Sequence, residues 1–357
     1  MTPVFWVGAA RATVYRPAQS YTAKEDTVAQ SLPKRTLGKT GIEVSAVGLG
    51  CMSFSGTYGP SDDAAATTLI HEAIDAGITF FDSSDAYGKG HNETLLGSAL
   101  KGKRAGVVIA TKFGNLMGAG GKFADNRPEF ITSSCEASLK RLGVDVIDLY
   151  YAHRIDPSVP IEETVGAMAK LVQQGKVRAL GLSEASPQTV ARAHKVHPIT
   201  AVQNEFSLLY REQADDTRAT TKGLGISFVA YAPLGRGLLT SDIADPSTLA
   251  EGDTRKRQPR YTGDNLAHNR ALAQKVEAIA KKKNCTPAQL ALAWVLAQGP
   301  DVVPIPGTKQ KKRMMENIGA LSVKLTEADL AEIASAVPAG SVKGTRYPEA
   351  QMASLYI

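Results

Sequence analysis

Residues 78–88 read ITFFDSSDAYG, and this stretch joins a buried strand to a polar turn. Residues 78–81 are apolar, aromatic or β-branched, as expected for a strand covered on both faces. Asp82 ends the strand, and Tyr87 follows after four small or polar residues. Because α/β proteins build their sites where parallel strands end, this stretch predicts both a fold class and the place of a functional site.

The same alternation of buried strand and helix recurs along the chain. Strands are expected at 46–50, 78–81, 107–112, 144–153, 177–183, 199–207, 226–235 and 302–309. Helices are expected at 61–76, 92–101, 129–142, 161–174, 187–195, 211–222, within 265–298 and at 310–320. Such alternation requires parallel strands joined by helical crossovers, and eight units are the number that closes a (β/α)8 TIM barrel. An open doubly wound sheet is the alternative, but its first turn would need a third glycine where Ser53 stands.

The flanking segments complete the predicted organisation. Residues 1–33 lack periodicity and are interpreted as a mobile leader, 34–337 as the barrel, and 338–357 as a C-terminal tail. Two short extended pieces around residues 38–41 predict a hairpin that closes the bottom of the barrel. The long segment 236–264 after the seventh strand is expected to be a lid or a substrate wall, with plain disorder as the alternative.

Composition narrows the class of protein. The 357 residues are 43% hydrophobic and 21% charged, with a net charge of +6. No apolar run approaches the roughly 18 residues of a membrane span, and the basic clusters are too short and scattered to predict nucleic-acid binding. Cys51, Cys135 and Cys285 are far apart, which favours a reducing, cytoplasmic compartment without disulfides or a metal site. The oligomeric state, monomer or homo-oligomer, stays open.

Polar or aromatic side chains stand at the end of almost every predicted strand. They are Asp82, Lys112, His153, Ser183, Gln203, Tyr231 and the pair Gly307 and Thr308. Because the strands are parallel, folding brings these groups to one mouth of the barrel.

The residue types at this mouth predict acid–base chemistry. A lysine ammonium close to Tyr87 would lower the pKa of the phenol, and Asp82 can supply the counter-charge that a buried Lys112 needs. His153 can hydrogen-bond a carbonyl oxygen and orient it. The site has no second carboxylate for glycoside hydrolysis, so the pattern favours protonation of an oxygen whose carbon receives a hydride from a cofactor.

A set of strings along the chain resembles the aldo-keto reductase family, in its bacterial and plant branches. They are GLGCMSF, FFDSSDAYG, ATK, DLYYAHRID, GLSE, QNEFS, YAPLGRGLL and IPGTK followed by R and EN. The resemblance implies a barrel that binds NADP(H) without a Rossmann domain and reduces aldehydes or ketones, or oxidises alcohols in reverse. It implies Tyr87 as proton donor, Asp82 and Lys112 as the groups that tune it, and His153 as the group that orients the carbonyl.

The resemblance also implies a cofactor site. Tyr231 would stack on the nicotinamide, Ser183 and Gln203 would hold its carboxamide, and residues 307–317 would hold the adenosine 2′-phosphate and adenine. The full set of implied cofactor residues is Gly50, Met52, Ser183, Gln203, Tyr231, Pro233, Leu234, Gly235, Gly237, Leu238, Gly307, Thr308, Lys309, Arg313, Glu316 and Asn317.

Basic chemistry independently favours NADPH over NADH. If a helix starts at Thr308, its N-terminus attracts an anion, and Lys309 and Arg313 lie one turn apart on one face, where they can clamp a phosphate.

The substrate is expected to be a small carbonyl compound or alcohol, and its pocket is the least defined part. Candidate wall residues are Met52, Phe54, Tyr58, Phe113, Asn115 and the 236–264 loop. Two other functions stay open. Lys112 could instead form a Schiff base, as in barrel aldolases, and the chain could be a slow cofactor-sensing subunit, because the family resembles potassium-channel β-subunits.

Overall fold

A computed structural model describes Met1 and residues 31–118, 121–240 and 246–357. Most of the predicted leader, residues 2–30, lies outside the described residues, as do residues 241–245 of the long loop.

Eight parallel strands form one curved sheet. They are β3 (Leu49–Gly50), β4 (Phe80–Asp82), β5 (Val108–Phe113), β6 (Ile147–Ala152), β7 (Val177–Ser183), β8 (Ile199–Glu205), β9 (Ser227–Tyr231) and β10 (Val302–Pro304). Each pairs with the next in sequence order from β3 to β10. The first and last strands meet through main-chain hydrogen bonds from Gly48 N to Pro304 O (3.0 Å) and from Gly50 N to Pro306 O (3.3 Å). The sheet therefore closes on itself, and the predicted barrel is confirmed.

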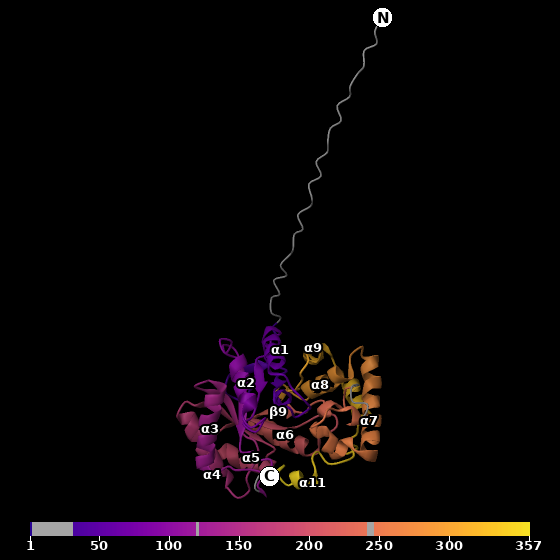
Figure 1. Ribbon diagram of the computed structural model, residues 1–357. Coiled ribbons are helices and arrows are strands. Elements are labelled where there is room, and N and C mark those ends of the chain that lie inside the picture. Colours follow the sequence, from indigo (N-terminus) through magenta and orange to yellow (C-terminus); the bar gives the residue numbers. More distant parts are fainter. Residues whose placement is uncertain (2–30, 119–120, 241–245) are drawn as a thin grey trace.

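Helices form the outer layer (Figure 1). They are α1 (Asp63–Asp75), α2 (His91–Ala99), α3 (Pro128–Leu142), α4 (Ile161–Gln173), α5 (Pro187–Val196), α6 (Glu212–Leu224), α7 (Gly263–Lys282), α8 (Pro287–Ala297) and α9 (Lys311–Gly319). Local sequence explains several helix starts: Asp62 and Ser186 accept hydrogen bonds from main-chain N–H groups of the first turn, and Thr286 forms a capping box with Gln289. None of these helices in the described part of the chain is long and apolar enough to cross a membrane.

The predicted hairpin is present as β1 (Lys34–Leu37) and β2 (Ile42–Ser45), which pair antiparallel. Its apolar side chains Leu37, Ile42 and Val44 pack into the cluster of residues that point into the barrel. The tight approach is shown at Gly38, where a Cβ atom would lie 2.8 Å from the main-chain oxygen of Thr200 at the start of β8. The hairpin therefore covers the N-terminal ends of the strands and leaves their C-terminal ends for the site.

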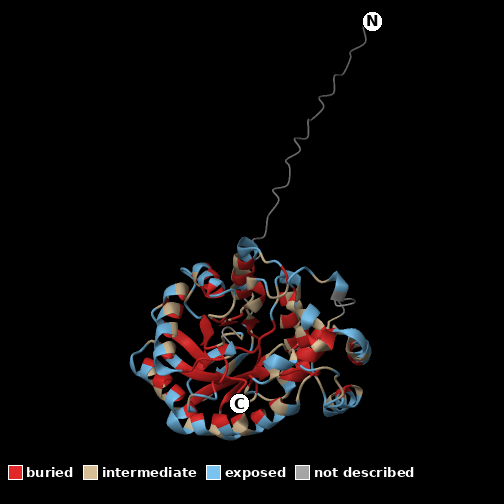
Figure 2. Cartoon of the chain, turned by 60° about the horizontal axis from the view of Figure 1, so that its bottom comes forward, coloured by how far each residue is buried: buried red, intermediate tan, exposed pale blue. Residues whose placement is uncertain are grey.

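Two hydrophobic layers hold the barrel together (Figure 2). One fills the interior with residues such as Phe80, Leu149 and Val229. The other lies between the strands and the surrounding helices, whose outer faces are exposed. Because the interior is filled from below by the hairpin and these side chains, the C-terminal strand ends are left to line a cavity.

The C-terminal tail, residues 338–357, contains a short helix and packs against the barrel. After β10 and α9, the chain forms α10 (Glu327–Ala336) and the short α11 (Glu349–Met352). Leu355 near the C-terminus is buried, and Ser186 N donates to Ile357 O at 2.9 Å. Residues 338–357 thus return to the mouth of the barrel beside β7.

Candidate active site

Four side chains from β4, β5 and β6 meet at the mouth. Asp82 is the last residue of β4, Lys112 is next to last in β5, and His153 directly follows β6. Lys112 Nζ donates to the Asp82 carboxylate and to Ser83 O (2.7 Å), and it lies 3.4 Å from the Tyr87 hydroxyl. The Tyr87 and His153 rings are edge to face, with centroids 5.8 Å apart. The predicted group of four thus comes together.

Asp82 and Lys112 form a buried pair at the floor of this group. Their side chains are 3% and 0% exposed. Burial raises the pKa of Asp82 and lowers that of Lys112, and the opposite charge of each partner acts against both shifts. Gln203 Nε2 also donates to Asp82 at 2.7 Å. This amide therefore supports the carboxylate, a role that sequence analysis did not assign to it.

The pKa of Tyr87 differs from the sequence-based expectation. Burial raises this pKa well above its ordinary value, and the Asp82 carboxylate raises it further, whereas Arg154 lowers it. The expected lowering by Lys112 is outweighed, first by burial of the phenol and then by the Asp82 carboxylate that is paired with that ammonium. Tyr87 is therefore a neutral phenol at neutral pH, which is the form that can give up a proton.

His153 is held in its neutral form. Burial lowers its pKa well below the ordinary value, and the charges of Arg154 and Lys112 lower it further. Its Nδ1 lies 2.9 Å from Ser84 Oγ, which is also 3.2 Å from an Asp85 oxygen. Burial raises the pKa of Asp85 to about 7. When Asp85 is protonated, Ser84 can give its single hydroxyl proton to Nδ1, so that Nε2 carries the ring proton and can donate it to a substrate oxygen.

A cavity of about 860 Å³ opens at this mouth. Asp82, Tyr87 and His153 line it. So do most residues proposed for the cofactor: Gly50, Met52, Ser183, Gln203, Tyr231, Pro233, Leu234, Gly237, Gly307, Thr308, Lys309, Arg313, Glu316 and Asn317. Met52, Tyr58 and Asn115 from the proposed substrate wall line it as well. Ser183 Oγ is buried here and has no hydrogen-bond partner among the described residues.

Four of the residues predicted for the cofactor or substrate site do not line the cavity. Phe113 is fully buried and packs on Tyr150 with ring centroids 5.0 Å apart, so it faces the helices, and Phe54 is buried in the same core. Leu238 belongs to the core beneath β9, and Gly235 acts through its oxygen, which accepts from Tyr261 at 2.7 Å. Alternation along a strand turns neighbours to opposite faces, which is why Phe113 points away when Lys112 points in.

The segment proposed for the 2′-phosphate differs in detail. The prediction that Thr308 starts the helix is wrong: α9 starts at Lys311 after Gln310, whose backbone is extended. Lys309 therefore precedes the helix, and its Nζ donates to the main-chain oxygens of Tyr58 (3.0 Å) and Pro60 (2.8 Å). Arg313 lies in the first turn and pairs with Glu316 at 2.6 Å. Both cations still line the cavity, but the two are not one turn apart on a helix face.

The described parts of the 236–264 loop form a wall of the cavity. Thr254 N donates to Thr57 O at 3.1 Å, and the Arg255 guanidinium lies 4.9 Å from the centre of the Tyr58 ring. Asp253 accepts from Arg255 at 2.6 Å and is almost fully buried. The loop thus bridges to the segment after β3, on the far side of the cavity, and the wall interpretation holds for its described residues.

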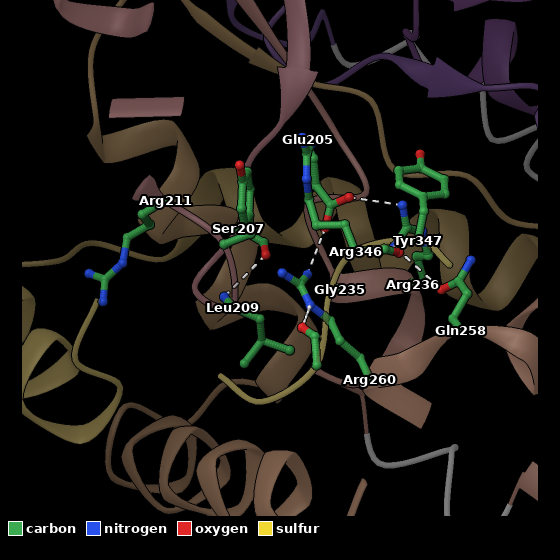
Figure 3. Close-up of polar contacts among 12 residues, drawn as sticks. Glu205, Ser207, Leu209, Arg211, Gly235, Arg236, Gln258, Arg260, Arg346 and Tyr347 are labelled. Carbon is green, nitrogen blue, oxygen red and sulfur yellow. Dashed lines mark hydrogen bonds and ion pairs between the residues drawn. The ribbon is translucent and has the colours of Figure 1, made fainter. Parts of the chain in front are cut away.

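A buried charge cluster lies behind the other half of the mouth (Figure 3). Glu205, at the end of β8, is fully buried and accepts from Arg236 NH2 (2.8 Å) and Arg260 NH1 (2.9 Å). Arg236 also stacks on Tyr347 with its guanidinium 4.6 Å from the ring centre. The cluster therefore ties β8, the long loop and the C-terminal segment together.

The C-terminal segment is a part of the site that sequence analysis missed. Arg346 is buried and forms two 2.8 Å hydrogen bonds with the Glu184 carboxylate, directly after β7. Glu184 also accepts from the Tyr231 hydroxyl at 2.8 Å. The segment then lines the cavity with Tyr347, Pro348, Gln351, Ser354 and Leu355. The string Arg-Tyr-Pro in a polar tail was the available signal.

Arg154 was also missed. It follows His153 directly in the string YAHRID, is 8% exposed and lines the cavity. A guanidinium next to a strand-end histidine was the signal, because long cations are rarely buried without a use.

Comparison with known proteins agrees with this geometry. The profile of the aldo/keto reductase family matches residues 46–338. The chain is 50% identical over 332 residues to a probable aldo-keto reductase 1 of Glycine max, covering 90% of this chain and 93% of that protein.

Two solved structures share the fold. A glycerol dehydrogenase from Gluconobacter oxydans superposes with a TM-score of 0.77 at 29% identity, covering 87% of this chain and 98% of that one. A thermostable aldo-keto reductase solved with the inhibitor epalrestat gives 0.68 at 30% identity, covering 85% and 100%. The chain therefore belongs to the aldo/keto reductase family, a family of NAD(P)-dependent oxidoreductases that act on small carbonyl substrates.

Proposed function

We propose that this protein is an NADPH-dependent carbonyl reductase that converts aldehydes or ketones to alcohols reversibly, with Tyr87 as the general acid and base. The observation that carries the proposal is the position of the Tyr87 hydroxyl. It lies 3.4 Å from Lys112 Nζ, which is bonded to buried Asp82, at a cavity that Tyr87 and His153 both line.

The residues present fit a nicotinamide cofactor. Ser183 Oγ is a buried hydroxyl without a partner in the described chain, as expected of a group that bonds the carboxamide. The Tyr231 hydroxyl is fixed by Glu184, so the ring beside it is a firm surface for stacking. Residues of the 307–317 segment would hold the adenosine end. When bound, the reduced nicotinamide supplies a hydride to the carbonyl carbon.

The chain's own residues handle the proton. Tyr87 gives its proton to the substrate oxygen as negative charge develops there, and His153 donates a hydrogen bond from Nε2 that orients the same oxygen. The ammonium of Lys112 then lies next to the phenolate that Tyr87 becomes, and Asp82 keeps that ammonium charged in spite of its burial. In the oxidation direction the same phenolate takes the proton back.

The test is NADPH oxidation followed at 340 nm with a panel of aldehydes, ketones and keto-sugars. We expect turnover by the unaltered protein and a loss of about 10²- to 10⁴-fold in kcat for Tyr87→Phe. NADPH binding, measured by fluorescence titration, should be unchanged in the variant. Turnover by Tyr87→Phe close to that of the unaltered protein would overturn the role of Tyr87, and no turnover with any substrate would favour the slow cofactor-sensing subunit.

The preference for NADPH is tested separately at the adenosine end. We expect Arg313→Ala to raise the KM for NADPH about tenfold or more and to leave that for NADH nearly unchanged, because a bond from a guanidinium to a phosphate is lost. Lys312→Ala is the matched control, since Lys312 is a neighbouring exposed cation outside the cavity lining. Equal effects of Arg313→Ala on both cofactors would count against a 2′-phosphate site here.

The Schiff-base function has one observation in its favour, because burial lowers the pKa of the Lys112 amine. Its geometry is unfavourable, since Nζ is fully buried and donates to Asp82 and Ser83 O. Borohydride trapping of a carbonyl substrate on Lys112 would support it, and no trapping is expected.

A further inference from the structure

We propose that Arg154 binds a carboxylate of the substrate, so that the carbonyl compounds this site takes are oxo acids. This inference rests on the proposed reductase function and names the substrate class of the same cavity.

Arg154 is a buried cation whose hydrogen-bonding capacity is largely unused. A guanidinium has five N–H donors. NH1 donates to the main-chain oxygen of His153 at 2.7 Å, and no other hydrogen bond or ion pair of this side chain occurs in the described chain. The side chain nevertheless has only 8% of its surface exposed. Burying a cation without a counter-charge is unfavourable, so an anion bound next to it would be stabilised.

Other buried arginines around the mouth show the difference. Arg236 and Arg260 pair with Glu205, and Arg346 pairs with Glu184 through both carboxylate oxygens. Glu184 is the carboxylate whose charge acts on Arg154, but its oxygens are already taken by Arg346 and Tyr231. The fold therefore provides a carboxylate for each of these arginines except Arg154.

The unused N–H donors of Arg154 lie at the cavity where the substrate is proposed to bind. The side chain lines the cavity next to His153, and its charge is close enough to act on the Tyr87 phenol. A substrate whose carbonyl oxygen lies between Tyr87 and His153 has its neighbouring atoms within reach of Arg154. Two tyrosines near Arg154, Tyr231 and Tyr347, line the same cavity and supply no carboxylate.

The ligand chemistry favours a carboxylate over a phosphate. The planar guanidinium fork matches the two coplanar oxygens of a carboxylate in a two-bond contact. Phosphate can also accept such a pair of bonds, but with a larger charge it is best held by several cations. In the described chain, the other buried cations around the mouth, Lys112, Arg236 and Arg346, each pair with a carboxylate.

The experiment compares substrates that differ in one charge. 4-Carboxybenzaldehyde and its methyl ester have similar size. The ester withdraws electrons from the carbonyl more strongly, so intrinsic reactivity alone would favour the ester. The 2- and 3-isomers vary the distance between carboxylate and carbonyl. We expect the unaltered enzyme to favour at least one acid over its ester by about tenfold or more in kcat/KM, as a bond to a charged group provides. Glyceraldehyde and its 3-phosphate form a second pair.

Variants assign the preference to Arg154. Arg154→Gln should bring the acid-to-ester ratio of kcat/KM down to about one or below, mainly by raising the KM for the acid. The ratio is the readout, because Arg154 also lowers the pKa of Tyr87 and of His153, so its loss changes the kcat for both substrates. Arg154→Lys, which keeps the charge but loses the fork, should retain part of the preference. Arg192→Gln is the control for loss of one positive charge, because Arg192 is a half-exposed residue of α5 that pairs with Glu162 outside the cavity lining.

The possible results distinguish a failure of the carboxylate assignment from a failure of the reductase function. An unaltered enzyme that reduces the esters at least as well as every acid overturns the assignment and leaves the reductase function standing. A stronger preference for the phosphate over all carboxylates also overturns it. A preference for acids that survives in Arg154→Gln does the same. If Arg154→Gln does not fold, inhibition of the unaltered enzyme by benzoate but not by methyl benzoate supports the proposal, and equal inhibition opposes it. Lack of any turnover removes the proposed function and this inference with it.

Discussion

Two clusters of buried charge stand at the same mouth of the barrel, and they differ in how completely their groups are paired. At the ends of β4 to β6, the Tyr87 hydroxyl has one long contact, and His153 Nε2 has no partner in the described chain. At the ends of β7 and β8, Glu184 and Glu205 accept hydrogen bonds from arginines at both oxygens. The first cluster keeps hydrogen-bonding groups open for a ligand, whereas in the second both carboxylates are paired at both oxygens.

This difference divides the mouth of the barrel into a reacting half, at the ends of β4 to β6, and a supporting half, at the ends of β7 and β8. Glu184 and Arg236 have left-handed backbones, with φ of 57° and 53°, which non-glycine residues adopt only when the surroundings hold them there. Their ion pairs and hydrogen bonds supply that support and fix the C-terminal segment over the cavity. Paired charges therefore shape the cavity, and neutral groups with open hydrogen-bonding positions act inside it.

The largest expected effect is that of Asp82→Asn in the reacting half. It leaves Lys112 buried without its counter-charge, so we expect a loss of about 10²-fold or more in kcat and about 3–5 kcal/mol in the free energy of unfolding. Asp148→Asn is the matched control, because Asp148 is an equally buried carboxylate near the start of β6 that pairs with Arg104 and Arg178. It should destabilise the protein and leave kcat unchanged. Similar losses of kcat in both variants would mean that the effect is structural.

The pattern of strand ends was sufficient to predict the reacting half. Asp82, Lys112 and His153 lie one strand–helix unit apart, and parallel strands bring such residues to one edge wherever the helices between them pack. The supporting half could not be predicted in this way. Arg346 and Glu184 are 162 residues apart, and no periodicity relates a tail to a strand end.

Two details of the sequence-based prediction were wrong, the helix start near Thr308 and the direction of the Tyr87 pKa shift, and each has a cause in the local structure. The helix start proposed for the anion site was misplaced at Thr308, because threonine is a good N-cap residue, whereas Gln310 is extended and α9 begins at Lys311. The direction of the Tyr87 pKa shift was wrong because residue types reveal a nearby cation but not the degree of burial, which here outweighs it.

The second prediction concerns the supporting half. Arg346→Met leaves Glu184 buried without its cation, and we expect the free energy of unfolding to fall by about 3–5 kcal/mol. We expect kcat to change by less than tenfold, because the reacting groups are untouched. The double variant Glu184→Gln/Arg346→Met should recover part of the stability, as urea unfolding will show. A loss of kcat as large as that of Asp82→Asn would erase the distinction between the two halves.

A smaller effect is expected at Ser84, which fixes the His153 ring. Ser84→Ala removes, among the contacts of this hydroxyl, the hydrogen bond to His153, which is worth about 0.5–1.5 kcal/mol, so kcat should fall by up to about tenfold while cofactor binding is kept. Ser138→Ala, at a fully buried serine of α3, is the control and should leave kcat unchanged. If both variants behave alike, the contact between Ser84 and His153 has no part in orienting the substrate.

The smallest effect is a difference in the range of pH over which each half changes the free energy of unfolding. Burial holds the pKa of His153 below its ordinary value of 6.5, so as the pH falls through 6.5 the unfolded chain takes up a proton that the folded chain does not, and stability declines. Burial alone would raise the pKa of Glu184, but the Arg346 charge outweighs burial and holds this pKa below 4.5. The contribution of Glu184 to stability is therefore complete above pH 4.5 and is lost only below it.

A single titrating group of this kind changes the free energy of unfolding by at most about 1.4 kcal/mol per pH unit. Urea unfolding between pH 8 and 4 should therefore show that His153→Gln removes a decline in stability between pH 6.5 and 5. His194, whose pKa burial also lowers, adds a decline of the same sign. Asp85, whose pKa burial raises to about 7, adds a slope of the opposite sign below pH 7, so the readout is the difference between the variant and the unaltered protein. Glu184→Gln should leave that interval unchanged and flatten the curve only below pH 4.5, because the two halves take up their protons in different ranges of pH. A slope between pH 6.5 and 5 that is the same with and without His153 would show that this ring is not held neutral in the fold.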